Sequence, residues 1–105
     1  MEQITAIELA AWLRDPGRAA PLLLDVREPD EFAAYRIEGA ALVPMRSLPA
    51  RLHELDRRGD IVMVCRSGAR SHHAGRFLTE NGFERVYNLA GGVLAWARDV
   101  DQAAA

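Results

Sequence analysis

The only cysteine of the chain, Cys65, opens a short stretch of small and basic residues, Cys-Arg-Ser-Gly-Ala-Arg-Ser at 65–71. The apolar run 61–64 before it predicts a buried strand, and the residues from Ser71 onward predict a helix. Three features of such a junction lower the pKa of a thiol: the free N–H groups of a helix start, small residues whose amides converge on an anion, and the fixed charges of Arg66 and Arg70. The residue types and their spacing therefore predict a thiolate nucleophile at neutral pH.

The alternative is that Cys65 is a small hydrophobe at the end of a strand, as most buried free cysteines are. Two arginines and a glycine within the next five residues do not suit an apolar burial site, so we favour the reactive thiol. Because there is no second cysteine, an intramolecular disulfide and a zinc site of several cysteines are excluded. The absence of lysine likewise excludes Schiff-base chemistry.

The length and composition fit one globular domain. The chain has 105 residues, of which 50% are hydrophobic and 27% charged, enough for one core and too few for two. A net charge of -2 argues against a general binder of nucleic acids or anionic membranes, which needs a basic face. No apolar run approaches the roughly 20 residues that span a bilayer, and the first residues lack the pattern of a signal peptide. We therefore expect a cytoplasmic protein with neither nucleic acid nor membrane as a partner.

Short apolar runs alternate with helical patterns along the chain. The runs predict strands at 22–26, 41–43, 61–64 and 86–89, and the patterns between them predict helices at 29–35, 47–55 and 71–81, with another that begins at 91. Thr5 and Glu8 have the spacing of a capping box and predict the start of a first helix that stops before Pro16. This alternation is typical of an α/β fold with a parallel sheet, in which ligands bind beyond the carboxyl ends of the strands.

The stretch 65–71 resembles the active-site loop of the single-domain rhodaneses, a family of thiosulfate sulfurtransferases. Two further stretches agree in position and order: 24–32, continued by 37–40, resembles the family's upstream signature, and 91–96 resembles its C-terminal motif. Together the resemblance spans residues 4 to 98. It departs from the family at Arg36 and Glu38, where rhodaneses usually have histidine and proline, and these positions are expected to affect local packing.

The resemblance implies an α/β, rhodanese-like three-layer fold of about five parallel strands flanked by helices. It implies one such domain over residues 1–100, and we expect a frayed tail over 101–105. It also implies that Cys65 is the nucleophile and that no cofactor or metal is used. The loop that binds the anionic donor would consist of Arg66, Ser67, Gly68, Ala69 and Arg70. Three further residues would support this loop: Asp25, Arg27 and Ser71.

The implied reaction moves a sulfane sulfur from a small anionic donor such as thiosulfate to cyanide or a thiol acceptor through a Cys65 persulfide. With no second cysteine, the acceptor is external and a ping-pong scheme follows. Three alternatives stay open: a persulfide carrier in a protein sulfur relay, a non-catalytic rhodanese-like binding module, and a cysteine phosphatase or arsenate reductase. The last is disfavoured because phosphatases use Cys-x5-Arg, whereas Cys65 and Arg70 form Cys-x4-Arg.

Several other residues are candidates for either a functional or a structural role. His72 and His73 would lie on the first turn of the helix after the loop, where they either face solvent or assist proton transfer. The pair Gly91–Gly92 either closes the rim of the site or makes a tight turn. Trp12 and Trp96 are expected in the core.

Overall fold

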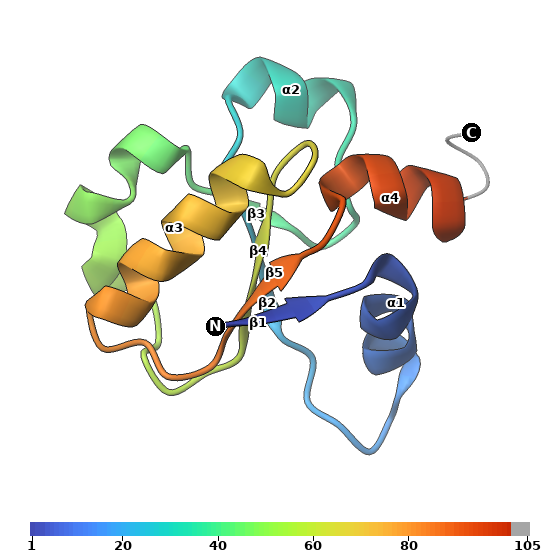
Figure 1. Cartoon of the computed structure of the whole chain (residues 1–105), viewed down its shortest axis with the longest axis horizontal. Helices are drawn as coiled ribbons and strands as arrows, with labels where there is room; N and C mark the ends of the chain where they lie inside the picture. The colour runs from blue at the N-terminus through green and yellow to red at the C-terminus, as the bar shows by residue number, and fades with distance from the viewer. Residues whose placement is uncertain (102–105) are drawn as a thin grey trace.

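Five parallel strands form the sheet at the centre of the molecule, in the order β1-β5-β4-β2-β3 (Figure 1). The computed structural model describes residues 1–101. Its elements are, in chain order, β1 (Glu2–Ile4), α1 (Ala6–Arg14), β2 (Leu22–Asp25), α2 (Pro29–Ala34), β3 (Ala41–Leu42), the 3-10 helices η1 (Met45–Ser47) and η2 (Pro49–Glu54), β4 (Ile61–Val64), α3 (Ala69–Glu80), β5 (Val86–Leu89) and α4 (Gly92–Asp99). The predicted α/β fold with a parallel sheet is confirmed.

Helices cover both faces of the sheet, which gives the molecule three layers. One core lies beneath α1 and α4 and the other beneath α3 and the 3-10 helices (Figure 1). All four residues of β4 are buried, because this middle strand is covered on both faces, and this explains its uninterrupted apolar sequence. Val62 and Val64 face the first core, whereas Ile61, Met63 and Cys65 face the second. The alternation along β4 thus directs Cys65 toward α3.

Three local predictions differ from the structure. The predicted helix 47–55 consists of η1 and η2 instead, because Pro49 has no N–H group to continue an α-helical ladder. The helix predicted from Ser71 begins at Ala69. The strand β1 was not predicted, since it has three residues and only Ile4 among them is buried, too short a stretch for a periodic pattern.

Both ends of the described chain are tied to the fold. Thr5 and Glu8 form the predicted capping box at the start of α1, with bonds of 2.9 and 3.1 Å. Asp101, the first residue of the predicted tail, accepts a hydrogen bond of 2.9 Å from the Tyr35 hydroxyl, and residues 102–105 lie outside the described residues. Among residues 1–101, no helix is long and apolar enough to cross a membrane.

Candidate active site

Cys65 follows β4 directly, at the carboxyl end of the middle strand, and is only 1% exposed. The chain then turns through Arg66, Ser67 and Gly68 and enters the 12-residue helix α3. Gly68 has a φ of +105°, in the left-handed region that glycine adopts without strain, and this lets the helix begin at Ala69. The fold therefore places the thiol beneath the start of a helix, as the sequence predicts.

Hydrogen-bond donors converge on the sulfur of Cys65. The amide of Gly68 lies 3.1 Å from Sγ and the hydroxyl of Ser71 lies 3.2 Å from it. Burial raises the pKa of Cys65, but donation from the Ser71 hydroxyl and from the amides of Ser71, Gly68 and Ser67 outweighs burial and leaves the pKa below the ordinary value of a thiol. Ser71, predicted as loop support, thus touches the sulfur directly.

The two arginines of the loop differ in their surroundings. Arg66 is exposed, and no carboxylate within residues 1–101 forms an ion pair with it. Arg70 points to α2, where its two terminal nitrogens each lie 2.8 Å from an oxygen of Glu31. The largest contributions that lower the pKa of Cys65 come from hydrogen bonds of the amides and of Ser71. The engagement of Arg70 with Glu31 was not predicted.

A buried polar network lies behind the sulfur. The Ser71 hydroxyl lies 2.6 Å from Oδ1 of Asn88, while Nδ2 of Asn88 donates to the Gly68 carbonyl at 3.1 Å and to Gln3 Oε1 at 3.0 Å. The carbonyl of Gly68 accepts only, so it fixes which way the Asn88 amide points. The hydroxyl of Ser71 has one proton and two acceptors, the sulfur and Asn88. The direction of this hydroxyl is therefore coupled to the protonation of Cys65.

Asn88 and Gln3 are site residues that sequence reasoning missed. Asn88 is 3% exposed and lies in β5, within the run 86–89 that was predicted to be a buried strand. A lone amide in a buried apolar run was the available signal, since a buried polar side chain needs a partner. Gln3 offered no comparable signal, because β1 itself was not predicted.

Asp25 and Arg27 form a buried ion pair at the end of β2, with side chains 0% and 4% exposed. The guanidinium contacts both oxygens of the carboxylate at 2.9 to 3.1 Å. It also donates to the carbonyl of Tyr35 at 2.7 Å, just after α2. The pair therefore joins the end of β2 to α2, whereas its support of the loop stays a prediction.

The start of α4 fixes the loop from the opposite side. The amides of Val93 and Leu94 donate to the carbonyls of Cys65 and Arg66 at 2.9 and 3.2 Å. A Cβ at Gly92, where φ is +58°, would overlap those two carbonyl oxygens. The structure therefore confirms the tight turn predicted for this glycine pair and adds its contact with the loop, while closure of the rim stays a prediction.

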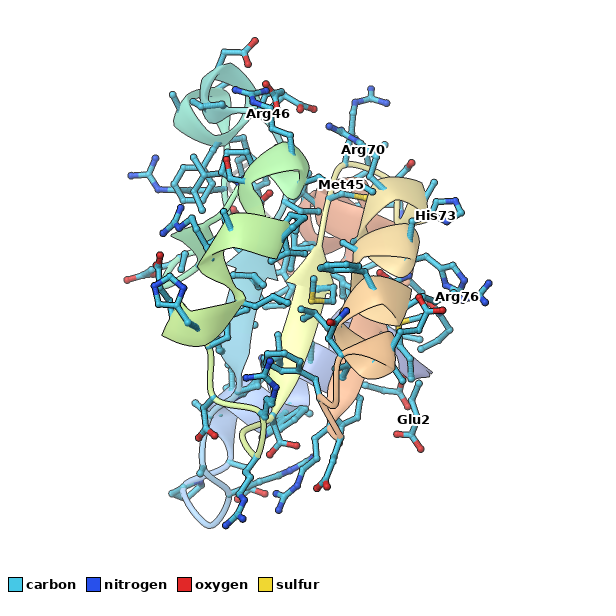
Figure 2. All side chains as sticks on the ribbon, turned by 90° about the vertical axis from the view of Figure 1, so that its left-hand side faces the viewer. Glu2, Met45, Arg46, Arg70, His73 and Arg76 are labelled. Carbon is cyan, nitrogen blue, oxygen red and sulfur yellow. The ribbon has the colours of Figure 1, made fainter. Side chains whose placement is uncertain are left out.

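The two histidines of α3 differ in exposure, and neither is hydrogen-bonded to the sulfur. His73 is exposed on the outer face of the helix (Figure 2). His72 is half-buried, with Nδ1 3.4 Å from the Gln3 amide nitrogen. Neither contacts Cys65. Within residues 1–101, no three histidine, cysteine or carboxylate side chains are grouped to hold a metal ion.

Comparison with known proteins gives one consistent result. The rhodanese-like domain family matches residues 5–99. A protein from Allochromatium vinosum named "Sulfurtransferase" is 47% identical over 77 residues, which cover 73% of this chain and 72% of the relative. "Putative sulfur carrier protein YrkF" from Bacillus subtilis is 35% identical over 74 residues, 70% of this chain and 40% of the relative.

Solved structures agree with the sequence comparison. The crystal structure of a rhodanese-like domain protein from Staphylococcus aureus superposes with a TM-score of 0.84 and 32% sequence identity, over 91% of each chain. The fold and its parallel sheet are therefore shared across almost the whole length of both chains.

Proposed function

The chain belongs to the rhodanese-like domain family, and on this premise we propose that it is a sulfurtransferase that carries sulfane sulfur as a persulfide on Cys65. The observation that carries the proposal is the buried sulfur that receives hydrogen bonds from Ser71 and Gly68 at the start of α3. Such donors stabilise an anion at the sulfur without a neighbouring base. A thiolate is the form of cysteine that attacks sulfur.

In the first half-reaction, the Cys65 thiolate attacks the outer sulfur of a donor such as thiosulfate. A new S–S bond forms to Cys65, the S–S bond of the donor breaks, and sulfite leaves with the electron pair of that bond. Cys65 then carries an anionic persulfide. The amides of Ser67 and Gly68 donate to Sγ of Cys65, the atom that bears the charge of the attacking thiolate, and they are fixed by the backbone before the donor arrives.

In the second half-reaction, cyanide or an external thiolate attacks the terminal sulfur of the persulfide. The S–S bond breaks and its electron pair returns to Cys65 as the thiolate. Among the 105 residues there is no second cysteine to take the sulfur internally. The acceptor is therefore a separate molecule, and the kinetics are ping-pong.

The remaining predicted residues have supporting roles in this proposal. Arg66, which is exposed and has no carboxylate partner among residues 1–101, meets the incoming anion. Asp25 and Arg27 hold α2 in place, and Arg70 ties the loop to that helix. A cytoplasmic setting would keep the single thiol reduced between turnovers.

Steady-state turnover tests the proposal. Thiosulfate and cyanide are supplied to the protein, and thiocyanate formation is measured beside the Cys65→Ser variant. Thiocyanate from the wild type and none from the variant supports the proposal. Equal rates in the two proteins would show that Cys65 is not the nucleophile. An aryl phosphate assayed in parallel should release no phosphate, because Arg70 is turned toward Glu31 and the loop is one residue shorter than Cys-x5-Arg.

A second function uses the same persulfide and differs only in its donor. The similarity to YrkF favours a role as a sulfur carrier, in which a partner protein loads Cys65. Turnover with thiosulfate far slower than loading from a protein persulfide would place the chain in this second role. Both of these functions need the thiol and should be lost in the Cys65→Ser variant. A non-catalytic binding module would still bind its partner without the thiol.

A further inference from the structure

Arginines gather at the end of the molecule where the loop lies, and most are already neutralised. Arg46 and Arg70 lie at this end, where α3 begins (Figure 2). Arg46 is paired with Glu28 and Arg70 with Glu31, both carboxylates of the α2 region, and Arg27 is paired with Asp25. Only Arg66 of the loop is without a carboxylate partner among the described residues.

The pair between Arg70 and Glu31 is held firmly. It is bidentate, with both bonds at 2.8 Å, the geometry that makes arginine–carboxylate pairs strong. The amide of Glu28 donates to the same carboxylate at 3.0 Å. Hydrogen bonds from Arg70 and from this amide lower the pKa of Glu31 to about 2, so the carboxylate is ionised at any working pH.

Arg70 lies in the first turn of α3, directly before Ser71, whose hydroxyl is 3.2 Å from the sulfur of Cys65, so the charge of Arg70 lies near the site. Hydrogen bonds to Glu31 raise the pKa of Arg70, and the negative charges of Glu31, Cys65 and Asp25 raise it further. Glu31 therefore cancels a positive charge that would otherwise act on the thiolate and on whatever anion approaches it.

We propose that Glu31, by pairing with Arg70, is a positioning residue that gives the site a preference for sulfur donors of low negative charge over doubly charged donors such as thiosulfate. This inference rests on the proposed function and names the donor class of that site. A doubly charged donor that approaches a thiolate needs compensation for repulsion between like charges, and Arg66 is the one loop arginine that is free to supply it.

The test compares two donors that differ in charge but not in chemistry. Thiosulfate is doubly charged and benzenethiosulfonate singly charged. With each, the Cys65 thiolate forms a bond to the outer sulfur, the S–S bond of the donor breaks, and sulfite or benzenesulfinate leaves with its electron pair. The quantity measured is the ratio of kcat/KM for thiosulfate to kcat/KM for benzenethiosulfonate, with cyanide as acceptor. This ratio does not depend on the fraction of protein that is folded.

The variants move the charge in opposite directions. Glu31→Gln keeps an oxygen for the Glu28 amide but frees Arg70, and we expect it to raise the ratio about fivefold, since the second charge of thiosulfate gains about 1 kcal/mol from a unit charge in a solvated setting. Arg70→Gln leaves Glu31 unpaired and should lower the ratio by a similar factor. Glu54→Gln, which removes the same charge from a residue that pairs with Arg51 within η2 instead, is the matched control and should leave the ratio unchanged.

Each outcome bears on the inference. Opposite shifts in the Glu31 and Arg70 variants, with none in the Glu54 variant, support it, and either variant alone suffices if the other does not fold. Ratios that stay unchanged in both variants, while both donors form the persulfide, overturn the inference and leave the proposed function intact. If neither donor loads Cys65 in the wild type, the proposed transfer from a small-molecule donor is wrong and this inference fails with it, which leaves only the carrier function that a partner protein loads.

Discussion

The Ser71 hydroxyl offers the sharpest perturbation of the sulfur. The hydroxyl lies 3.2 Å from Cys65 Sγ, and Ser71 is 0% exposed. Bulk water therefore does not supply the hydrogen bond that the hydroxyl makes to the sulfur. A hydrogen bond to an ionised group is worth about 1.5 to 3 kcal/mol, and each pKa unit corresponds to about 1.4 kcal/mol. The Ser71→Ala variant should therefore raise the pKa of Cys65 by about one to two units.

The direction follows from which form of the sulfur the hydroxyl stabilises. It donates to the thiolate, and its loss leaves only the backbone amides to oppose the effect of burial, which raises the pKa. The assay is the rate of alkylation by iodoacetamide as a function of pH, with the midpoint giving the pKa.

A control on the same helix separates the sulfur from general effects of losing a hydroxyl. Thr79 donates to the Gly75 carbonyl at 3.0 Å, far along α3 from the loop, so Thr79→Ala should leave the alkylation midpoint in place. A folded Ser71→Ala variant with the wild-type midpoint would refute the reasoning. It would mean that the amides alone set the acidity of Cys65.

Three further predictions concern the surroundings of the sulfur. Asn88→Ala frees the neighbouring hydroxyl to donate to sulfur alone, so the alkylation midpoint should fall by about half a unit, opposite to the effect of losing the hydroxyl. Gly92→Ala should abolish turnover and lower the free energy of unfolding by more than about 2 kcal/mol in urea titrations, because its Cβ overlaps two loop carbonyls. The control is Gly39→Ala, where φ is +86° and nothing lies within 4 Å of the added Cβ. It should lower the free energy of unfolding by about 1 kcal/mol and preserve turnover. The pKa of Glu31 is lowered to about 2 in the folded protein, so its pair with Arg70 stabilises the fold fully above pH 4.5, near the unfolded pKa, and this stabilisation is lost as the pH falls toward 2. Glu31→Gln should therefore reduce by about 1 kcal/mol the change in the free energy of unfolding between pH 5 and pH 2. Equal acid unfolding curves for the variant and the wild type would contradict this.

The sequence predicted those parts of the site that depend on neighbours along the chain. The apolar run 61–64, the small residues after Cys65 and the helix that follows are local patterns, and the structure has a strand, a turn and a helix there. The parallel sheet also followed from alternation of apolar runs and helical patterns. The start of α3 was placed at Ser71 instead of Ala69, because a glycine followed by small residues indicates a loop as readily as a helix start.

The contacts that set the charge at the sulfur could not be predicted in this way. Glu31 lies 39 positions before Arg70, and their pairing exists only because α2 is held over the loop. Asn88 contacts Ser71 because β5 pairs with β4 in the register that places Asn88 beside Met63. The four-residue sequence of β5 does not specify that register. The sequence therefore identifies Arg70 as a loop arginine. Only the tertiary structure shows that Glu31 is its partner and neutralises its charge at the site.

The mass of the Cys65 peptide after exposure to a sulfur donor tests the central claim most directly. Wild-type protein is incubated with benzenethiosulfonate or thiosulfate, separated from the donor, digested under non-reducing conditions, and measured before and after addition of cyanide. We predict a gain of one sulfur atom on the peptide that contains Cys65, its loss on addition of cyanide, and an equal amount of thiocyanate released. An unchanged Cys65 peptide with both donors, or an added sulfur that cyanide does not remove, would contradict the claim that this thiol carries a transferable sulfur.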